Sequence, residues 1–201
     1  KGVLLLTGLK PNLEKPLRAI GCIKEGDLHC QVYEQLDFGL EWCEDQLIRI
    51  VSKDSDQSKS IHDVLLDWFG NKDVVKLFVS YLQEKSVPSG YHIFNQNDPS
   101  DSIYILEKGQ ASIYLELEDN SKIRLRKIKE GAIVGEMGVY RKTTRTASFI
   151  SDKECTFYCL TEDALNRMRK EHPQLAIIFH KFVVCLISDR LTTANKILGE
   201  I

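Results

Sequence analysis

The sequence lacks an apolar run long enough to cross a membrane, and it carries little net charge. A membrane-spanning helix needs roughly 18 or more apolar residues in succession, whereas the longest candidate, residues 175–188, is interrupted by His180 and Lys181. The apolar run at residues 3–6 is too short for a secretory signal. The formal net charge is −2, so composition gives no support to nucleic-acid binding, and we expect no nucleic-acid partner.

Closely spaced cysteine pairs and histidine clusters are also absent. The six cysteines form no Cys-x-x-Cys pair and lie in apolar or mixed segments. Buried free thiols in a reducing compartment explain them best, which predicts a chain in the cytosol or facing it. A zinc site would need tighter clustering with histidine. Because catalytic motifs such as Gly-x-Ser-x-Gly are missing as well, we expect no metal, no cofactor and no enzymatic activity.

The chain has enough apolar residues for a packed core, and a polar segment divides it into two parts. Hydrophobic residues make up 43% of the chain, too many for a disordered protein. Residues 52–60 are all polar, the composition of a linker. The sequence therefore predicts an N-terminal unit at 1–51 and a larger C-terminal unit at 61–201.

The N-terminal unit has the pattern of part of an α/β domain. A continuous apolar run at 2–8 is typical of a strand buried on both faces of a parallel sheet. A short helix is predicted at 13–20, with Asn12 as its N-cap and Gly21 as its stop. A second strand follows at 30–33 and an amphipathic helix at 38–51. Two strands and two helices are too few to bury both faces of such a strand. We therefore expect that this unit is the second half of a domain, and that the chain starts inside a longer protein.

The C-terminal unit has a helical beginning, a strand-rich middle and a helical end. Apolar spacing predicts helices at 60–69 and 73–85. Between 91 and 160 the apolar period is mostly two, with turn signals about every ten residues, as in a sandwich or roll. A helix capped by Thr161 runs to about Glu171, and Pro173 opens a final helix to Leu198. The predicted fold class is α+β: a β-roll (jelly roll) with flanking helices.

One segment, residues 131–148, interrupts the strand period and concentrates polar chemistry. Three glycines are followed by small residues around Arg145, which lets backbone N–H groups approach a ligand. A short helix beginning near Glu136 would direct free N–H groups at an anion. Arg145 can pair with phosphate oxygens, and Glu136 is an acceptor suited to a ribose hydroxyl. The two side chains together could hold one nucleotide.

This segment resembles the phosphate-binding cassette of the cyclic-nucleotide-binding domain family. The resemblance rests on Gly135-Glu136 and on Arg145-Thr146-Ala147-Ser148, with nine residues from the glutamate to the arginine. The stretch from Val87 to Gly109 matches the family's opening strands, and the whole match covers roughly residues 73–198. Two positions depart from the family pattern: Thr144 replaces the usual proline and Val134 the usual phenylalanine.

The resemblance implies a ligand, cAMP or cGMP, and a role for each cassette residue. Glu136 would take the ribose 2′-hydroxyl and Arg145 the cyclic phosphate. Backbone amides near Gly135, Met137 and Ala147 would complete the phosphate grip. Thr146 would favour or tolerate cGMP, because its hydroxyl can reach the guanine amino group.

The N-terminal unit resembles the second half of a STAS domain, the cytosolic tail of SulP-type anion transporters. The residues that carry this resemblance lie at 3–9, 17–22 and 38–47. In that context the chain would lie on the cytosolic side of a membrane, as part of an integral membrane protein. Its partners would be a cyclic nucleotide, the transmembrane domain of the same parent chain and, in a homodimer, a second copy of the chain. The family's phosphorylatable site would precede Lys1.

Alternatives remain open at this point. The roll could be a ligand-free scaffold for assembly or trafficking of the transporter, with Arg145 and Glu136 in an internal ion pair. A cupin-like metal site would need clustered histidines, but only His92 lies in the predicted roll. A transcription factor would need a helix-turn-helix after the final helix. That helix either packs on the roll or, over 186–198, forms a lid over the base.

Overall fold

The structure, a computed structural model, describes residues 2–24, 27, 29–33, 39, 42–43, 59–119 and 121–199. The chain divides into two compact units, Lys1–Gln57 and Ser58–Ile201. Most of the predicted linker at 52–60 and most of the predicted helix at 38–51 lie outside the described residues. Both therefore stay predictions.

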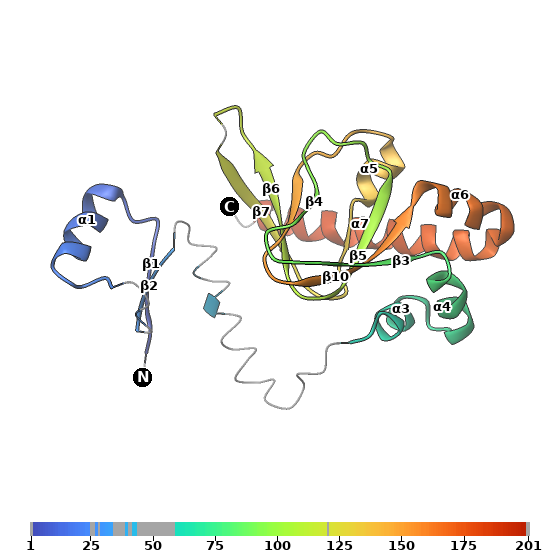
Figure 1. The fold of residues 1–201 in the computed structure, drawn as a ribbon, viewed down its shortest axis with the longest axis horizontal. Helices are drawn as coiled ribbons and strands as arrows, with labels where there is room; N and C mark the ends of the chain where they lie inside the picture. The colour runs from blue at the N-terminus through green and yellow to red at the C-terminus, as the bar shows by residue number, and fades with distance from the viewer. Residues whose placement is uncertain are drawn as a thin grey trace. The chain divides into compact units, whose positions relative to one another are not determined.

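The first unit contains a parallel strand pair with a helix in the connection. Strand β1 (Leu4–Thr7) pairs in parallel with β2 (Cys30–Tyr33), and α1 (Pro11–Ala19) lies between them in the chain (Figure 1). The helix starts earlier than predicted, at Pro11 after the N-cap Lys10, because proline is well suited to the first helical position. The expectation of a strand buried on both faces is wrong for β1, whose Leu4 is 58% exposed.

The second unit is built on two four-stranded antiparallel sheets (Figure 1). The first sheet has the order β3-β10-β5-β8, and the second has the order β4-β9-β6-β7. The strands are β3 (Gln83–Val87), β4 (His92–Phe94), β5 (Ser102–Lys108), β6 (Ala111–Glu116), β7 (Lys122–Ile128), β8 (Ile133–Val134), β9 (Ser148–Ser151) and β10 (Cys155–Thr161). The strand-rich middle is thus a jelly-roll-like arrangement, as the period of two predicts.

Strand β5 of the first sheet is buried on both faces, which explains its nearly continuous apolar character. Ile103 and Ile105 point to one side and contribute to a core shared with the helices. Leu106 points to the other side, into the core between the two sheets, together with Phe149 and Phe157. Side chains that alternate along β5 therefore contribute to two separate hydrophobic cores, one on each face of the sheet.

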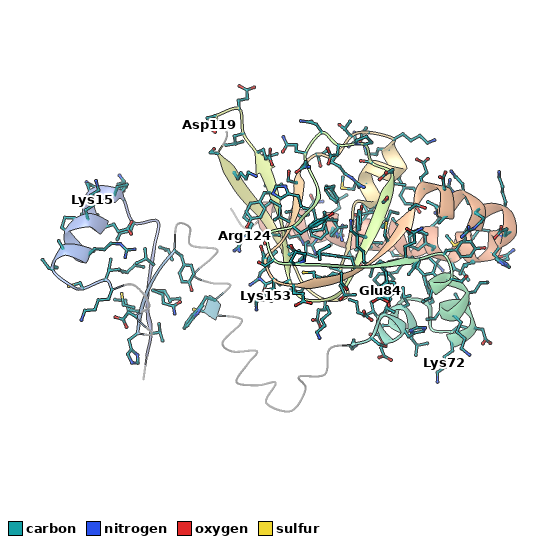
Figure 2. All side chains as sticks on the ribbon, viewed as in Figure 1. Lys15, Lys72, Glu84, Asp119, Arg124 and Lys153 are labelled. Atoms are coloured by element: carbon teal, nitrogen blue, oxygen red, sulfur yellow. The ribbon has the colours of Figure 1, made fainter. Side chains whose placement is uncertain are left out.

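Four helices cover the outer face of the first sheet. These are α3 (Ile61–Phe69), α4 (Lys72–Val79), α6 (Glu162–Glu171) and α7 (Pro173–Gly199). Aromatic rings from different helices pack on each other. The ring centroids of Trp68 and Phe182, which are stacked, lie 4.2 Å apart, and those of Phe78 and Phe179, which are tilted, lie 5.0 Å apart. Charged side chains such as Lys72, Glu84 and Lys153 lie on the surface of this unit (Figure 2).

The cap residues explain where these helices begin. Ser60 and Asp63 form a capping box at α3, Asn71 accepts from two backbone N–H groups at α4, and Thr161 caps α6 as predicted. The predicted helix at 73–85 is wrong in its second half. It ends at Val79, and residues 83–87 form β3 because their backbone pairs with β10.

The final helix packs on the core with only part of its predicted apolar face. Leu175, Phe179 and Val183 are buried, whereas Ile178 and Leu191 are exposed. The cysteines are free, but the expectation that all are buried is wrong: Cys155 is buried, and Cys22 and Cys185 are exposed. None of the helices described here has both the length and the apolar character needed to cross a membrane.

Candidate functional site

The site is organised around a sharp turn between β8 and the short helix α5 (Glu136–Arg141). The turn residue, Gly135, has φ +92°, a conformation that glycine adopts without a steric penalty. A Cβ at this position would lie 2.5 Å from Nη1 of Arg145 and 3.0 Å from the carbonyl oxygen of Ser102. Glycine is therefore required here both by the backbone conformation and by the close approach of Arg145.

Arg145 is buried, with 4% of its surface exposed, and its guanidinium is oriented by backbone carbonyls. Nη2 donates to the carbonyl of Ser102 at 2.7 Å, and Nη1 donates to that of Gly135 at 3.1 Å. The guanidinium also lies over the ring of Phe94, 4.2 Å from its centroid. Burial lowers the pKa of Arg145, but an arginine keeps its charge at neutral pH. The protein thus holds a fixed positive charge at this point.

Glu136 is also buried, at 2% exposure, and its partner comes from the last helix, 54 residues further along the chain. Arg190 of α7 donates from Nη1 to the Glu136 carboxylate and from Nη2 to the carbonyl of Ile133 at 2.8 Å. The internal ion pair between Arg145 and Glu136 that a ligand-free roll would contain is not formed. Each of these charges has a different partner, so the carboxylate and the arginine remain separate groups.

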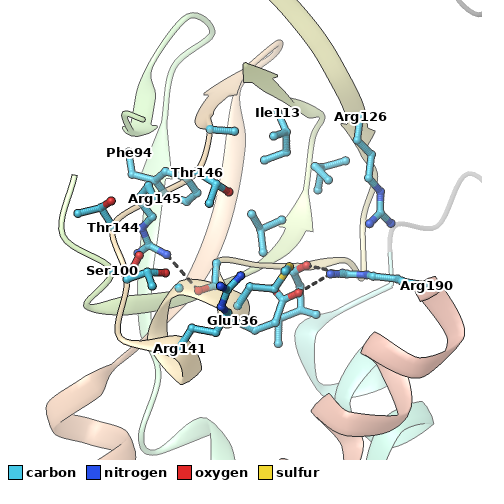
Figure 3. Close-up of a pocket in the computed structure, with 18 residues that line it drawn as sticks. Phe94, Ser100, Ile113, Arg126, Glu136, Arg141, Thr144, Arg145, Thr146 and Arg190 are labelled. Atoms are coloured by element: carbon cyan, nitrogen blue, oxygen red, sulfur yellow. Dashed lines mark hydrogen bonds and ion pairs between the residues drawn. The ribbon is translucent and has the colours of Figure 1, made fainter. Parts of the chain in front are cut away.

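Both residues line one cavity, and Figure 3 shows how their side chains are arranged. All six residues predicted from the sequence lie in its wall: Gly135, Glu136, Met137, Arg145, Thr146 and Ala147. In Figure 3, Arg145 and Thr146 lie on one side of the cavity and Arg126 and Arg190 on the other, with Glu136 between them. The structure therefore brings the predicted residues together, while their contacts with a ligand stay a prediction.

Sequence reasoning missed several polar residues that line the same cavity, four of which come from different parts of the fold. Ser100 comes from the loop before β5, Arg126 from β7, Arg141 from the end of α5 and Arg190 from α7. None of them lies within the cassette pattern from Glu136 to Ser148 except Arg141, which the pattern leaves unspecified. Arg190 is the one contribution to the cavity from the predicted lid, residues 186–198, among the residues described there.

Three buried polar atoms in the described part of the chain have no hydrogen-bond partner, and all three belong to this cavity's wall. They are Oγ of Ser100, Nε of Arg145 and Nε of Arg190. Buried polar groups in native proteins are nearly always paired, so unpaired ones need an explanation. Two N–H donors and a hydroxyl around one cavity suit a polar ligand that carries acceptor oxygens. In the same part of the chain, no cluster of His, Cys, Asp and Glu side chains is arranged to hold a metal ion.

Comparison with known proteins identifies the family of this unit. Residues 84–172 match the sequence model of the cyclic nucleotide-binding domain. A solved structure with the same fold is a cyclic nucleotide-binding domain from Methylobacillus flagellatus KT, with a TM-score of 0.64 and 23% identity over 70% of this chain and 82% of that one. Thermus thermophilus catabolite activator protein has a TM-score of 0.56 and 22% identity over 64% of this chain and 59% of its own. Residues 84–172 are therefore identified as a cyclic nucleotide-binding domain.

Curated relatives carry this region within much longer and diverse proteins. Glutaminase 2 of Bradyrhizobium diazoefficiens is 26% identical over 163 residues, which cover 80% of this chain and 25% of the glutaminase. Human potassium/sodium hyperpolarization-activated cyclic nucleotide-gated channel 1 is 26% identical over 132 residues, 65% of this chain and 14% of the channel. The chain thus spans a quarter or less of the length of these relatives. Similar regions thus occur in proteins with different names and lengths.

Proposed function

We propose that the unit Ser58–Ile201 senses a cyclic nucleotide, cAMP or cGMP, and serves as a regulatory module without catalytic activity of its own. The observation that carries the proposal is the set of unpaired buried polar atoms of Ser100, Arg145 and Arg190 around one cavity. That cavity also holds every residue that the cassette resemblance assigns to ligand contact.

The proposed arrangement places the cyclic phosphate at Arg145 and the ribose at Glu136. The carbonyls of Ser102 and Gly135 each accept from one terminal nitrogen of Arg145. Two of its five N–H groups are then used, and the others, including the unpaired Nε–H, remain for phosphate oxygens. A charge-assisted bond of this kind is about twice as strong as a neutral one. Glu136 accepts from Arg190 with one oxygen, and a carboxylate has a second oxygen with which to accept from the ribose hydroxyl.

The experiment is isothermal titration of cAMP and cGMP into the full chain and into Arg145→Ala. We expect saturable binding by the wild type and a loss of affinity of at least about tenfold in the variant, since bonds to charged groups contribute about 1.5–3 kcal/mol. Arg145→Lys keeps the charge and serves as a second variant if the alanine form unfolds. Lys153→Ala removes an exposed positive charge from outside the cavity and should bind as the wild type does.

The ligand-free scaffold is the second candidate function, and one observation favours it. Glu136 and both terminal nitrogens of Arg145 already have internal partners. If the wild-type chain is folded and gives no heat with either nucleotide at millimolar concentration, the sensor proposal is wrong and the scaffold proposal takes its place.

The parent protein that we propose is a SulP-type anion transporter, with the first unit as part of its STAS domain on the cytosolic side of the membrane. The parallel pair of β1 and β2, connected through α1, supports an α/β unit of this kind. The glutaminase match covers more of the chain than Ser58–Ile201, so part of the first unit is shared with those relatives too. The sequence encoded upstream of Lys1 tests the proposal: a transporter requires membrane-spanning helices there, and a glutaminase-like sequence would overturn it.

A further inference from the structure

Three helices of the second unit meet at one histidine, His180 of α7. Its ring lies between Tyr140 of α5 and Arg169 of α6. The hydroxyl of Tyr140 is hydrogen-bonded to Nδ1, and the two rings meet edge to face with their centroids 5.4 Å apart. On the other side, Nε of Arg169 donates to Nε2 at 3.3 Å. His180 therefore connects the short helix of the cassette with both helices that follow the roll.

The two partners determine where the proton of the neutral His180 ring lies. An arginine can only donate hydrogen bonds, so Nε2 presents its lone pair to Arg169. The ring then carries its proton on Nδ1 and donates it to the oxygen of Tyr140. Burial raises the pKa of Tyr140 to about 12, so the phenol stays uncharged near neutral pH. In the described part of the chain, the titratable groups that face this ring are therefore Tyr140 from α5 and Arg169 from α6, and exposed Lys181 is its neighbour along α7.

A second proton on His180 would disrupt this arrangement. Protonated Nε2 is a donor that faces the N–H donor of Arg169, and two positive charges then lie side by side. Both effects move the ring away from Arg169, and a ring that moves also leaves Tyr140. Burial and the charge of Arg169 accordingly lower the pKa of His180. The contact among the three helices therefore requires the neutral ring.

The helix that Tyr140 belongs to forms part of the proposed nucleotide site. Tyr140 itself does not line the cavity, because its hydroxyl is directed to His180. Four other residues of α5 do line the cavity, and Figure 3 labels two of them: Glu136, Met137, Gly138 and Arg141. A change at His180 thus reaches the site through the position of α5, without any contact between His180 and the ligand.

We propose that His180 is a positioning residue for α5, and that a nucleotide binds tightly only while the His180 ring is neutral. Ligand and proton then compete, so nucleotide affinity falls as the pH is lowered and His180 becomes protonated. No histidine in the described part of the chain lines the cavity, so direct contact with the ligand does not produce the same effect. The inference rests on the proposed function, since it takes the same cavity to be a nucleotide site.

The test is the dissociation constant of cGMP at pH 7.5 and at pH 5.0, measured by titration calorimetry on the full chain. The charge of cGMP itself does not change in this range. Wild type should bind about fivefold more weakly at pH 5.0, the lower end of typical coupling between two sites. His180→Gln, whose side chain does not titrate, should bind equally at both pH values. His62→Gln replaces an exposed histidine outside the cavity and should keep the wild-type pH dependence.

Tyr140→Phe separates this role from a general loss of stability at low pH. The variant keeps the bond between Arg169 and His180, so its melting temperature should still fall with pH. It loses the hydrogen bond to α5, so its affinity for cGMP should be independent of pH. At pH 7.5 it should already bind as weakly as the wild type does at pH 5.0.

Two kinds of result would contradict these expectations, and they differ in what they overturn. If wild-type affinity is the same at both pH values, or if His180→Gln or Tyr140→Phe keeps the pH dependence, the role of His180 is wrong and the sensor proposal stands. Absence of binding of both cGMP and cAMP to the folded wild type at pH 7.5 would overturn the sensor proposal, and this inference with it.

Discussion

Arg190, near the end of α7, donates a hydrogen bond to the buried carboxylate of Glu136 at the start of α5. The same guanidinium donates to the carbonyl of Ile133 at 2.8 Å. One side chain thus connects the last helix with both the strand that enters the cassette and the residue predicted to hold the ribose. The ion pair stabilises the position of α7 against the roll.

Substitution of Arg190 should therefore destabilise the domain. Arg190→Ala removes the partner of a buried carboxylate, and we expect the free energy of unfolding to fall by about 2 kcal/mol. Urea denaturation measures this difference. Lys181→Ala, at an exposed position of the same helix, should change stability by less than about 0.5 kcal/mol. Equal losses in the two variants would show that the ion pair does not stabilise the helix.

Gly135→Ala should cost more than a similar substitution at another glycine with positive φ. Gly135 and Gly90 have φ of +92° and +78°, so alanine is strained at both, by about 1–2 kcal/mol. A Cβ at Gly90 has no atom within 4 Å, whereas one at Gly135 would displace Arg145. The difference in unfolding free energy between the two variants isolates that contact. Nucleotide affinity should fall in Gly135→Ala alone, and an equal effect at both sites would contradict the role of Gly135.

The role of Glu136 can be tested with a matched pair of ligands. Glu136→Gln should weaken cGMP binding by about tenfold, as expected for a bond to a charged acceptor. The variant should lose much less affinity for 2′-deoxy-cGMP, which has no hydroxyl to donate. Calorimetric titration of both ligands into both proteins gives the comparison. Equal losses for the two ligands would show that Glu136 acts through Arg190 and the fold alone.

Stability should decrease as the pH falls below about 6.5, and His180 should contribute to the decrease. Burial and the nearby Arg169, which donates to Nε2 at 3.3 Å, lower the pKa of His180. The folded state then binds a proton less readily than the unfolded state, whose histidine pKa is about 6.5. The stabilising effect of the neutral ring is present above that pH and is lost as the pH falls through the lower folded pKa.

Thermal unfolding at pH 7.5 and pH 5.5 measures this effect. His180→Gln should show a smaller fall in melting temperature between the two pH values than the wild type does. Exposed His62 provides the control, and His62→Gln should behave as the wild type. An unchanged pH dependence in His180→Gln would contradict the assignment.

The parts of the fold that the sequence predicted well are those with strong local signals. Thr161 and Pro173 mark the starts of α6 and α7, and the alternation Ile103/Ile105 marks a strand. The helix end at Val79 was missed because residues 83–87 carry no strand pattern and become β3 through pairing with β10. Non-local pairing of this kind overrides local propensity and leaves no trace in a single sequence.

For the site, too, local sequence signals could be predicted, and contacts between distant segments could not. Glu136 and Arg145 lie nine residues apart, so one segment displays both and the cassette resemblance finds them. Arg190 is separated from its partner Glu136 by 54 residues, and Arg126 faces the cavity because of its register with Ile113. Only the folded structure brings these two arginines to the cavity, so no sequence motif could have assigned them.

The most direct test of the central claim is to locate the ligand site in solution. Two-dimensional ¹⁵N–¹H NMR spectra of the labelled chain should be recorded with increasing cGMP, and then with increasing cAMP. Saturable shifts concentrated on the amides of residues 133–147 and of Arg126 are the predicted result, because Arg126 and most residues of that segment line the cavity. Shifts elsewhere on the domain, or no shifts in a well-dispersed spectrum at millimolar nucleotide, would contradict the account.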